Sequence, residues 1–498
     1  MSDRTFRRSG YPEVFIKKCT SINPLGMFQG NSYHSEKQIS DKEQKIHDPI
    51  SRSYDTIIIG GGVCGTALLY TLSKYTNVNR IALIEKEPDV ALINSYTNSN
   101  SQTLHFGDIE TNYTLAKATK VNRGASLVKN YLLGRDKQQK IYTKYHKMVL
   151  GVGKNQVEQL KARYHEFKQL FPHLKLLDRA QIAAKEPKVL LERQTDEEII
   201  ALYTDEGYAV DFNALARSFL HNAVSNTDKS IDLLFDSKVK RIVKDKDIYK
   251  VELANETIAA KTVMVAAGAH SLMFAKSLGY GLNYALLSVA GSFYFAPKLL
   301  NGKVYTVQRQ KLPFAAIHGD PEVHDRQIAR FGPTAKVLPM LERHNYSTVI
   351  EYFQTAGLSI KAIASFVKIL SDPTIFKYIA INFLYDFPVI GKSLFIKEVK
   401  KIIPSIKLNN LTYARGYGGV RPQIVNLNTK ALEMGEAKII GDRIIFNITP
   451  SPGASTCLQN ALEDTEKIIN FLGDGYQFDR QKFLSELNPN STPTLLAE

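Results

Sequence analysis

Residues 55–65, DTIIIGGGVCG, decide the fold of this chain. The apolar half of the stretch ends in the spacing Gly60-x-Gly62-x-x-Gly65, and helix-forming residues follow it. A second apolar run, IALI, then ends on Glu85, about twenty residues after the turn. A strand, a glycine-rich turn, a helix and a second strand ending in an acid form the dinucleotide-binding fingerprint.

Each part of the fingerprint has a physical role. Gly60 permits the tight turn, Gly62 lets backbone N–H groups approach a pyrophosphate, and Gly65 lets the helix pack closely on the strand. The positive end of the helix dipole favours the phosphates. Glu85 can accept hydrogen bonds from ribose hydroxyls and would repel a 2′-phosphate, so FAD or NAD is favoured over NADP.

Bulk composition restricts the class of protein. The 498 residues are 44% hydrophobic and 23% charged, enough for two or three domains or one large two-lobed fold. The net charge of +15 suits an anionic membrane surface or anionic substrates, and without a nucleic-acid-binding signature we expect no nucleic-acid partner. The three cysteines are scattered, without disulfide or metal-ligand spacing, so we expect no metal.

Residues 1–52 are predicted to be a basic N-terminal extension. Arginine and lysine outnumber the two acids among the first eighteen residues, which resembles a mitochondrial targeting segment, although those acids weigh against it. A disordered extension before the first strand is the alternative. No secretory apolar region is present.

The middle of the chain changes its pattern of elements. Alternating strands and helices give way to short strands at 231–235, 239–243, 248–253 and 256–260, followed by an apolar strand that ends at Gly268. A meander that returns to the main sheet is typical of flavoproteins with two dinucleotide-binding halves. The pattern therefore favours FAD over NAD.

Residues 350–403 form a separate apolar and basic segment. Isoleucine, phenylalanine and leucine alternate with lysines, and no run reaches eighteen uncharged apolar residues, so we expect no transmembrane helix. The segment is either a helical cap on the core or an interfacial segment whose apolar side chains enter lipid while its lysines meet anionic headgroups.

The pattern also predicts a division into domains. The FAD-binding domain is discontinuous within 54–472 and is interleaved with a substrate domain, and a tail follows at 473–498. We assign to the FAD-binding domain about 54–150, 205–283 and 411–472, and to the substrate domain about 151–204 and 284–410.

Eight motifs, in this order along the chain, resemble the malate:quinone oxidoreductases found in some bacteria and in apicomplexan parasites. This family belongs to the glycine/D-amino-acid-oxidase fold group, and the resemblance covers about residues 54–472. L-2-hydroxyglutarate dehydrogenases are also similar, around His105 and Asp211, but the 350–400 segment favours the malate family. The motifs are GGGVCG, NSNSQTLHFGDIETNYTLAKATKVNRGA, TDEGYAVDFNALA, VAAGAHS, LPFAAIHGDPEV, RFGPTA, GYGGVRPQ and SPGAST.

The resemblance implies a fold and an activity. The fold is α/β (α+β), an FAD-binding, two-dinucleotide-domain Rossmann-like fold with an inserted antiparallel-sheet substrate domain and a helical membrane-facing segment. The activity is oxidation of (S)-malate to oxaloacetate by hydride transfer to flavin, with electrons passed to a ubiquinone-type membrane quinone. The protein would be peripheral on the mitochondrial inner membrane in a eukaryote, and otherwise on the cytoplasmic membrane.

Two alternatives stay open at this point. One is an FAD-dependent dehydrogenase or oxidase for L-2-hydroxyglutarate, another 2-hydroxy acid or an amino acid. The other is a binding module of the same fold without a working flavin, against which the intact fingerprint from Gly60 to Glu85 argues.

The resemblance also implies which residues contact FAD. The three fingerprint glycines would contact the pyrophosphate and Glu85 the ribose, while Val239 would contact adenine through its backbone. Small residues at the end of the returning strand allow the backbone to lie against the ligand, as at Gly268. The flavin would be flanked by Ser101, Gln102, Thr103, Gly453, Ala454 and Ser455.

Malate oxidation needs a base for the C2 hydroxyl and cations for two carboxylates. A neutral imidazole suits the base at pH 7, and we favour His318, at the end of a strand expected over 314–317, with His105 on the flavin or substrate side. Arg421, between a glycine pair and a proline, is the preferred carboxylate ligand because its planar fork suits bidentate recognition. Arg330 is the expected second cation.

Overall fold

The computed structural model describes residues 50–225, 227–308, 316–356, 359–387, 390–433, 437–448 and 452–488. The N-terminal extension expected over 1–52 lies outside these residues, except for its last three positions. Parts of the motifs LPFAAIHGDPEV and SPGAST also lie outside them, as does the end of the tail expected over 473–498.

The fingerprint folds as the sequence predicts. Strand β1 (Ile50–Ile59) runs into the glycine turn, helix α1 (Val63–Tyr75) begins after it, and strand β2 (Arg80–Ile84) returns parallel to β1. Both faces of β1 are covered: Ile58 packs in the core beneath α1, whereas Ile57 packs in the core on the opposite face. A parallel strand buried on both faces reads as a continuous apolar run, which is why the sequence signal is clear.

This parallel sheet gathers strands from distant parts of the chain. Its order is β19-β20-β9-β1-β2-β6, and all of these strands run parallel except the outer β19. The strands not yet given are β6 (Ser230–Leu234), β9 (Thr257–Val265), β19 (Ala437–Ile440) and β20 (Ile444–Ile448).

The meander differs in detail from its prediction. Only β7 (Arg241–Asp245), β8 (Ile248–Glu252) and β9 form it, and β9 is a single strand where two were expected, at 256–260 and from 262. β6, expected as its first strand, instead pairs with β2 in the parallel sheet. A short apolar run does not indicate which strand it will pair with. The sequence therefore predicted β6 correctly as a strand but not its pairing with β2.

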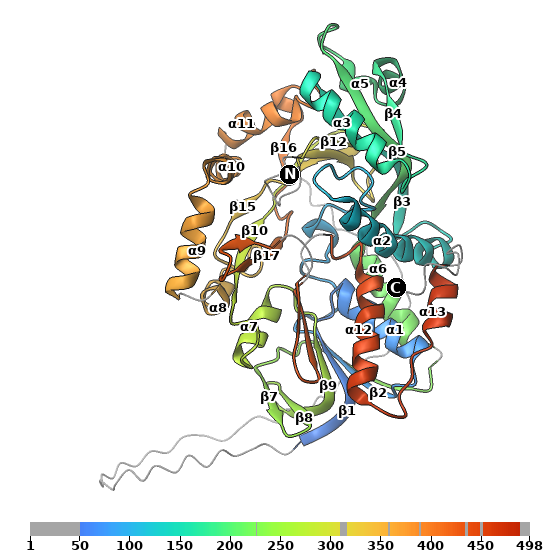
Figure 1. Cartoon of the computed structure of the whole chain (residues 1–498), viewed down its shortest axis with the longest axis vertical. Helices are drawn as coiled ribbons and strands as arrows, with labels where there is room; N and C mark the ends of the chain where they lie inside the picture. The colour runs from blue at the N-terminus through green and yellow to red at the C-terminus, as the bar shows by residue number, and fades with distance from the viewer. Residues whose placement is uncertain are drawn as a thin grey trace, which may run out of the picture. The chain divides into compact units, whose positions relative to one another are not determined.

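Helices cover the parallel sheet on the side of α1. Figure 1 shows α1, α12 and α6 in this layer, and α1 packs against both of the others. Asp211 caps α6 as expected, because its Oδ1 accepts the N–H groups of Asn213 and Ala214 at 2.9 and 3.2 Å. The helices of this layer are α2 (Leu115–Arg135), α6 (Phe212–Val224), α12 (Cys457–Leu472) and α13 (Arg480–Leu487).

Two further sheets form the other half of the molecule. The eight-stranded sheet has the order β16-β11-β14-β13-β12-β3-β5-β4, and the four-stranded sheet β15-β10-β17-β18. Their strands are β3 (Tyr142–Val152), β4 (Lys175–Leu177), β5 (Ile199–Val210), β10 (Tyr284–Ala290), β11 (Tyr294–Pro297), β12 (Lys303–Thr306), β13 (His318–Pro321), β14 (Ile328–Gly332), β15 (Lys336–Val337), β16 (Thr412–Tyr413), β17 (Val420–Asn426) and β18 (Ala431–Leu432).

Sheet membership differs from the expected division of the chain at three places. β3, the C-terminal half of β5 and the strands β16 to β18 were assigned to the FAD-binding part, yet they pair within the two further sheets. The strand expected over 314–317 lies partly outside the described residues, and His318 is the first residue of β13. The remaining helices of this half are α3 (Lys154–Phe167), α4 (Arg179–Lys185) and α5 (Pro187–Leu190), whereas α7 (His270–Ser277) packs against β20 of the parallel sheet.

Four consecutive helices account for the apolar and basic segment. They follow one another along one edge of the molecule in Figure 1. Among the described residues no single helix is long and apolar enough to cross a membrane; α8 and α9 meet that criterion only together, bent by 96°. The helices are α8 (Thr348–Ala356), α9 (Ile360–Leu370), α10 (Pro373–Leu384) and α11 (Ile390–Val399).

Candidate active site

A cavity of about 290 Å³ lies at the carboxyl ends of β1, β2 and β9. In sheets of this type, ligands bind outside the carboxyl ends of the parallel strands. Most of the residues expected to hold a dinucleotide line this cavity, although they come from six separate segments: Gly60, Gly62, Glu85, Ser101, Thr103, Val239, Gly268, Gly453, Ala454 and Ser455.

The glycine turn is shaped by close backbone approaches. Gly60 has φ +110°, and a Cβ on it would lie 2.5 Å from the carbonyl oxygen of Ala266. Gly65 does not line the cavity; a Cβ there would lie 1.9 Å from the carbonyl oxygen of Gly60, so its role is the close packing of α1 on the turn. Glu85 is aimed at the turn, because its Oε2 accepts the N–H of Gly61 at 2.7 Å.

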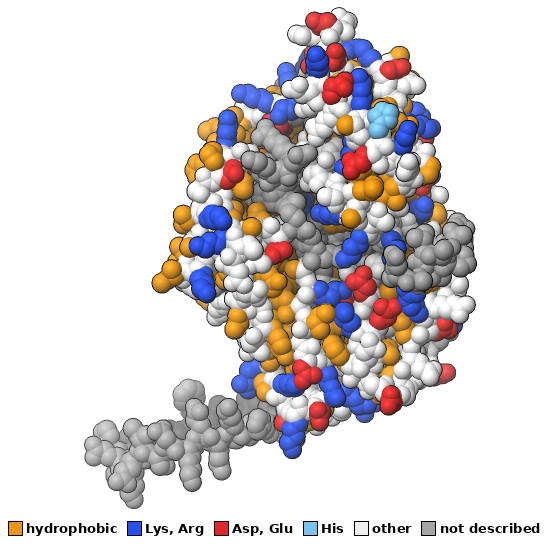
Figure 2. Space-filling model, viewed as in Figure 1, with side chains coloured by type: hydrophobic (Ala, Val, Ile, Leu, Met, Phe, Trp, Pro, Cys, Tyr) orange, Lys and Arg blue, Asp and Glu red, His pale blue; other side chains and the backbone are white. Residues whose placement is uncertain are grey.

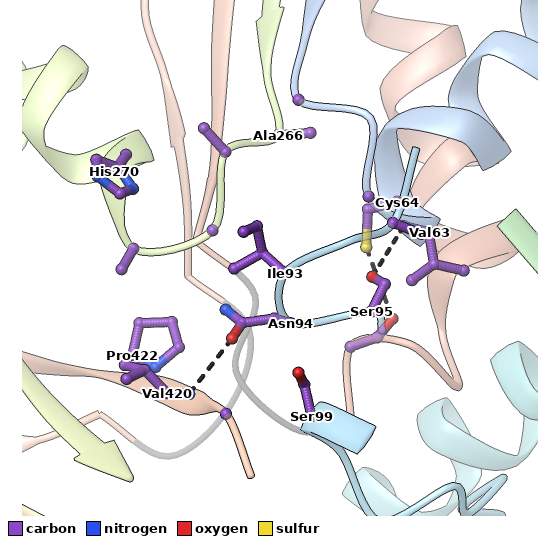
Figure 3. Close-up of a pocket in the computed structure, with 18 of the residues that line it drawn as sticks. Val63, Cys64, Ile93, Asn94, Ser95, Ser99, Ala266, His270, Val420 and Pro422 are labelled. Atoms are coloured by element: carbon purple, nitrogen blue, oxygen red, sulfur yellow. Dashed lines mark hydrogen bonds between the residues drawn. The ribbon is translucent and has the colours of Figure 1, made fainter. Parts of the chain in front are cut away.

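A loop after β2 contributes two side chains that the sequence analysis did not identify. Ser95 Oγ accepts the N–H of Val63 at 3.1 Å, and Asn94 Oδ1 accepts the N–H of Val420 at 3.3 Å, as Figure 3 shows. Asn94 therefore joins the cofactor cavity to β17. No local signal reveals this role, because the partner lies 326 residues further along the chain.

The two segments expected to flank the flavin meet in the structure. Ser455 Oγ accepts the backbone N–H of His105 at 2.9 Å, which ties the loop around residues 101–105 to the turn before α12. Contrary to the expectation, Gln102 is not among the residues that line the cavity. Its buried amide donates to Glu322 Oε1 at 2.6 Å and accepts the N–H of Val323 at 3.0 Å, so it holds the loop in place instead.

The large cavity has further polar lining residues that the sequence did not reveal. Lys238 and His270 line it: Lys238 forms an ion pair with Glu351 of α8 at 2.7 Å, and His270 Nε2 lies 2.9 Å from the same carboxylate. Glu342, also a lining residue, pairs with Lys86. These pairs attach the start of the four-helix segment to the dinucleotide side of the cavity.

One buried side chain tests whether the cavity suits a polar ligand. Asn447, on β20, lines the cavity, and neither its amide nitrogen nor its amide oxygen has a hydrogen-bond partner among the described residues. Leaving a buried amide unpaired costs about 1–3 kcal/mol per group. Together with the glycine cradle and Glu85, this amide fits a dinucleotide with hydrogen-bonding edges.

A smaller pocket, of about 20 Å³, adjoins the cofactor cavity. Ser101, His105 and Arg421 line both spaces, whereas Tyr305 and His318 line only the smaller one. A substrate in the smaller pocket would therefore lie next to the flavin side of the cofactor cavity. The structure brings together three of the four residues expected to act on the substrate.

His318 is almost completely buried and has one unpaired ring nitrogen. Its Nδ1 lies 3.1 Å from the carbonyl oxygen of Ala316, so Nδ1 carries the proton and donates it. Nε2 has no hydrogen-bond partner among the described residues and lies 3.6 Å from Asp320 Oδ1. Burial lowers the pKa of His318 to about 4, although the nearby Asp320 opposes this shift. At pH 7 the ring is neutral, with Nε2 able to accept a proton.

Arg421 is a cation without a described anion. It lines both spaces from β17, and no carboxylate of the described residues lies within ion-pair distance of it. Burial lowers the pKa of its guanidinium, but an arginine keeps its charge at neutral pH. A half-buried cation with no carboxylate partner among the described residues, at the junction of the two spaces, favours an anionic ligand there.

Arg330 does not reach either space. It is fully buried, and its Nη2 pairs with Asp320 at 2.8 Å and donates to the carbonyl oxygen of Ser101 at 3.1 Å. The expectation that Arg330 is a second substrate cation therefore has no support from the geometry. Its guanidinium positions Asp320 and the flavin-side loop.

The sheets have the fold of solved FAD-dependent oxidases, among them glycine oxidase from Geobacillus kaustophilus, with a TM-score of 0.58 at 16% identity over 87% of this chain and 98% of its own. The solved structure of L-α-glycerophosphate oxidase from Mycoplasma pneumoniae with FAD bound superposes with a TM-score of 0.59 at 17% identity, and covers 84% of this chain and 95% of its own. The predicted fold class is confirmed. This likeness concerns the fold alone.

The chain belongs to the malate:quinone oxidoreductase family, whose pattern matches residues 52–492. Malate:quinone oxidoreductases from Campylobacter jejuni (named as probable) and Helicobacter pylori are 43% and 41% identical, over 88% of this chain and 99% of theirs. Human L-2-hydroxyglutarate dehydrogenase is 26% identical, over 82% of this chain and 86% of its own, so the alternative substrate is not favoured.

Family membership makes the chain an oxidoreductase that acts on the CH–OH group of malate with a quinone as acceptor. The resemblance drawn from the sequence is confirmed. The bacterial origin of the two malate:quinone relatives gives no support to a mitochondrial location.

Proposed function

We propose that the 290 Å³ cavity holds FAD and that (S)-malate binds where this cavity meets the adjoining pocket. Gly60 and Gly62, with the N-terminus of α1, would hold the pyrophosphate, Glu85 the ribose, and the segments around Thr103 and Gly453 the flavin. Bound FAD supplies the hydride acceptor for C2 of malate.

The proposal rests chiefly on one observation. His318 Nε2, which has no hydrogen-bond partner among the described residues, and Arg421, which has no carboxylate partner among them, line the same small pocket beside the larger cavity. His318 would take the proton of the C2 hydroxyl, and the resulting imidazolium would be stabilised by Asp320, 3.6 Å away. Arg421 would bind one carboxylate and thereby place C2 toward the flavin side.

Anaerobic titration tests the substrate. We expect malate to bleach the flavin absorbance of the FAD-loaded protein at concentrations at which lactate and L-2-hydroxyglutarate do not, because the small pocket offers cationic groups within a short reach. A flavin that is bleached by 2-hydroxyglutarate and not by malate would refute the proposal. A protein that cannot take up FAD at all would support the alternative of a binding module.

We further propose that helices α9 and α10 place the enzyme on an anionic membrane, where a ubiquinone-type quinone accepts the electrons. On α9 the exposed Ile360, Ile363 and Val367 recur at helical spacing, while the opposite side of the helix is buried. Phe376 continues this surface on α10, with an exposed fraction of 60%. An apolar stripe on a surface helix beside lysines is typical of interfacial helices.

Basic side chains surround the apolar stripe. Figure 2 shows orange and blue side chains interspersed along the edge that carries these helices. Lys361, Lys368 and Lys377 are exposed on α9 and α10 and suit anionic headgroups. The surface faces away from the core, so it is available to lipid while the substrate pocket stays enclosed. In a bacterium this would place the protein at the periphery of the cytoplasmic membrane.

Replacing Val367 and Phe376 together with glutamate is expected to weaken binding to vesicles containing phosphatidylglycerol by roughly tenfold or more, because two apolar contacts with lipid are lost. Sedimentation with vesicles measures the effect, and quinone reduction should fall while dye reduction stays unchanged. Leu282→Glu is the matched control, since Leu282 is 64% exposed outside this segment. Equal sedimentation of the double variant and the unchanged protein would contradict the membrane assignment.

A further inference from the structure

A dicarboxylate needs a second partner in the substrate pocket. Arg421 accounts for one carboxylate of malate if the proposed function holds, on which this inference rests. Arg330 is occupied by Asp320 and lies outside the pocket. Among the described residues that line the pocket, His105 is the remaining group that can carry a positive charge besides the buried, neutral His318.

His105 is held by a buried carboxylate. Its Nδ1 lies 2.7 Å from Glu110 Oε1, and the side chains of His105 and Glu110 are 15% and 8% exposed. Although burial opposes it, the hydrogen bond and the charge of His105 lower the pKa of the Glu110 carboxyl, so Glu110 is ionised at neutral pH. A carboxylate at Nδ1 fixes the orientation of the ring and leaves Nε2 as the ring nitrogen that can meet a ligand.

The other buried cations near the pocket already have partners. Lys147 pairs with Asp108, and Lys303 and Arg330 both pair with Asp320. A malate dianion bound to Arg421 alone would keep one negative charge without a cation, and burying an unpaired charge is costly. A protonated His105 would supply that cation.

We propose that His105 binds the second carboxylate of the substrate as an imidazolium, and that Glu110 is the positioning residue that keeps it protonated and oriented. This pair would set the preference for dicarboxylates over 2-hydroxy acids with a single carboxylate. Neither member needs to act on the hydride or on the C2 hydroxyl. The pair therefore governs which substrate binds, whereas His318 governs how fast it reacts.

The experiment compares malate with 2-hydroxybutyrate, in which a methyl group replaces the second carboxylate. For His105→Gln and Glu110→Gln, kcat/KM for malate is expected to fall roughly 10- to 100-fold, the value of a charge-assisted hydrogen bond. The loss should lie in KM, with kcat nearly unchanged and 2-hydroxybutyrate oxidised as before. Unchanged oxidation of 2-hydroxybutyrate also shows that the variants are folded and loaded with flavin.

His146→Gln is the matched control. His146 forms a buried pair of the same kind, 2.8 Å from Glu186 and 14% exposed, but lines neither space. This variant should leave the ratio of kcat/KM for malate to kcat/KM for 2-hydroxybutyrate unchanged. The inference is overturned if Glu110→Gln or His105→Gln lowers kcat/KM equally for malate and for 2-hydroxybutyrate, or changes neither. Failure of the unchanged protein to oxidise malate would instead refute the proposed function itself.

Discussion

Replacing His318 with glutamine is expected to slow anaerobic reduction of the flavin by malate by about 10²–10⁴-fold, the usual contribution of a general base. The effect is large because His318 Nε2 is the unpartnered basic nitrogen of the substrate pocket and its ring is neutral at pH 7. Glutamine keeps much of the volume but cannot accept the proton. Stopped-flow absorbance of the bound flavin measures the rate, and a titration measures malate affinity, which should change little because Arg421 remains.

The pH dependence gives an independent check on His318. A base works in its unprotonated form, so with a pKa of about 4 the reduction rate should stay level through the neutral range and fall only as the pH approaches that value. His324→Gln is a suitable control: this histidine follows β13, is half exposed and pairs with Asp211 outside both spaces. If His318→Gln reduced its flavin as fast as the unchanged protein, the base would have to be another residue.

Replacing Arg421 with methionine is expected to weaken malate binding by two to three orders of magnitude, or about 3–4 kcal/mol, within the usual cost of truncating one partner of a buried charge pair. Arg421 is the cation that lines both the cofactor cavity and the substrate pocket, and no described carboxylate compensates it. Loss of the guanidinium removes the cation that is proposed to bind one carboxylate of malate. The dissociation constant, measured by the change in flavin absorbance with malate, reports the effect directly.

Arg415→Met is the control for Arg421. Arg415 is exposed in the same segment and lines neither space, so its replacement should leave malate affinity unchanged. Arg421→Lys separates charge from geometry, because lysine keeps the charge but loses the bidentate fork. Affinity equal to that of the unchanged protein in Arg421→Met would show that the carboxylate binds elsewhere.

The cofactor side of the site was predicted more completely than the substrate side. The glycine turn and Glu85 act through backbone geometry within one strand–helix–strand unit, so a local motif reveals them. Asn94 and Asn447 were missed because each is an ordinary polar residue whose role depends on a wall built by other segments. Gln102 was expected at the cofactor because its neighbours are there, but its side chain turns to Glu322.

On the substrate side, residues of similar chemistry have different surroundings in the structure. His318 and Arg421 were chosen for their chemistry and lie together, whereas Arg330 was chosen on equal chemical grounds and is buried against Asp320. An arginine beside a strand end looks the same in sequence whether it faces a pocket or a carboxylate. Glu110 gave no signal, because its role depends on its burial beside the ring of His105, which the sequence does not show.

By itself, the sequence determined the dinucleotide fingerprint, the meander, the apolar and basic segment and, through its eight ordered motifs, the family. These features depend on local periodicity, on glycine at positions that tolerate no Cβ, and on the order of the motifs. All three can be seen in the sequence itself. Only the tertiary structure decided which charged side chains are paired and which are free. Pairing depends on strands that come together from distant positions in the chain. Asp320 forms ion pairs with Lys303 and Arg330, whereas Arg421 lines the pocket without a carboxylate partner among the described residues.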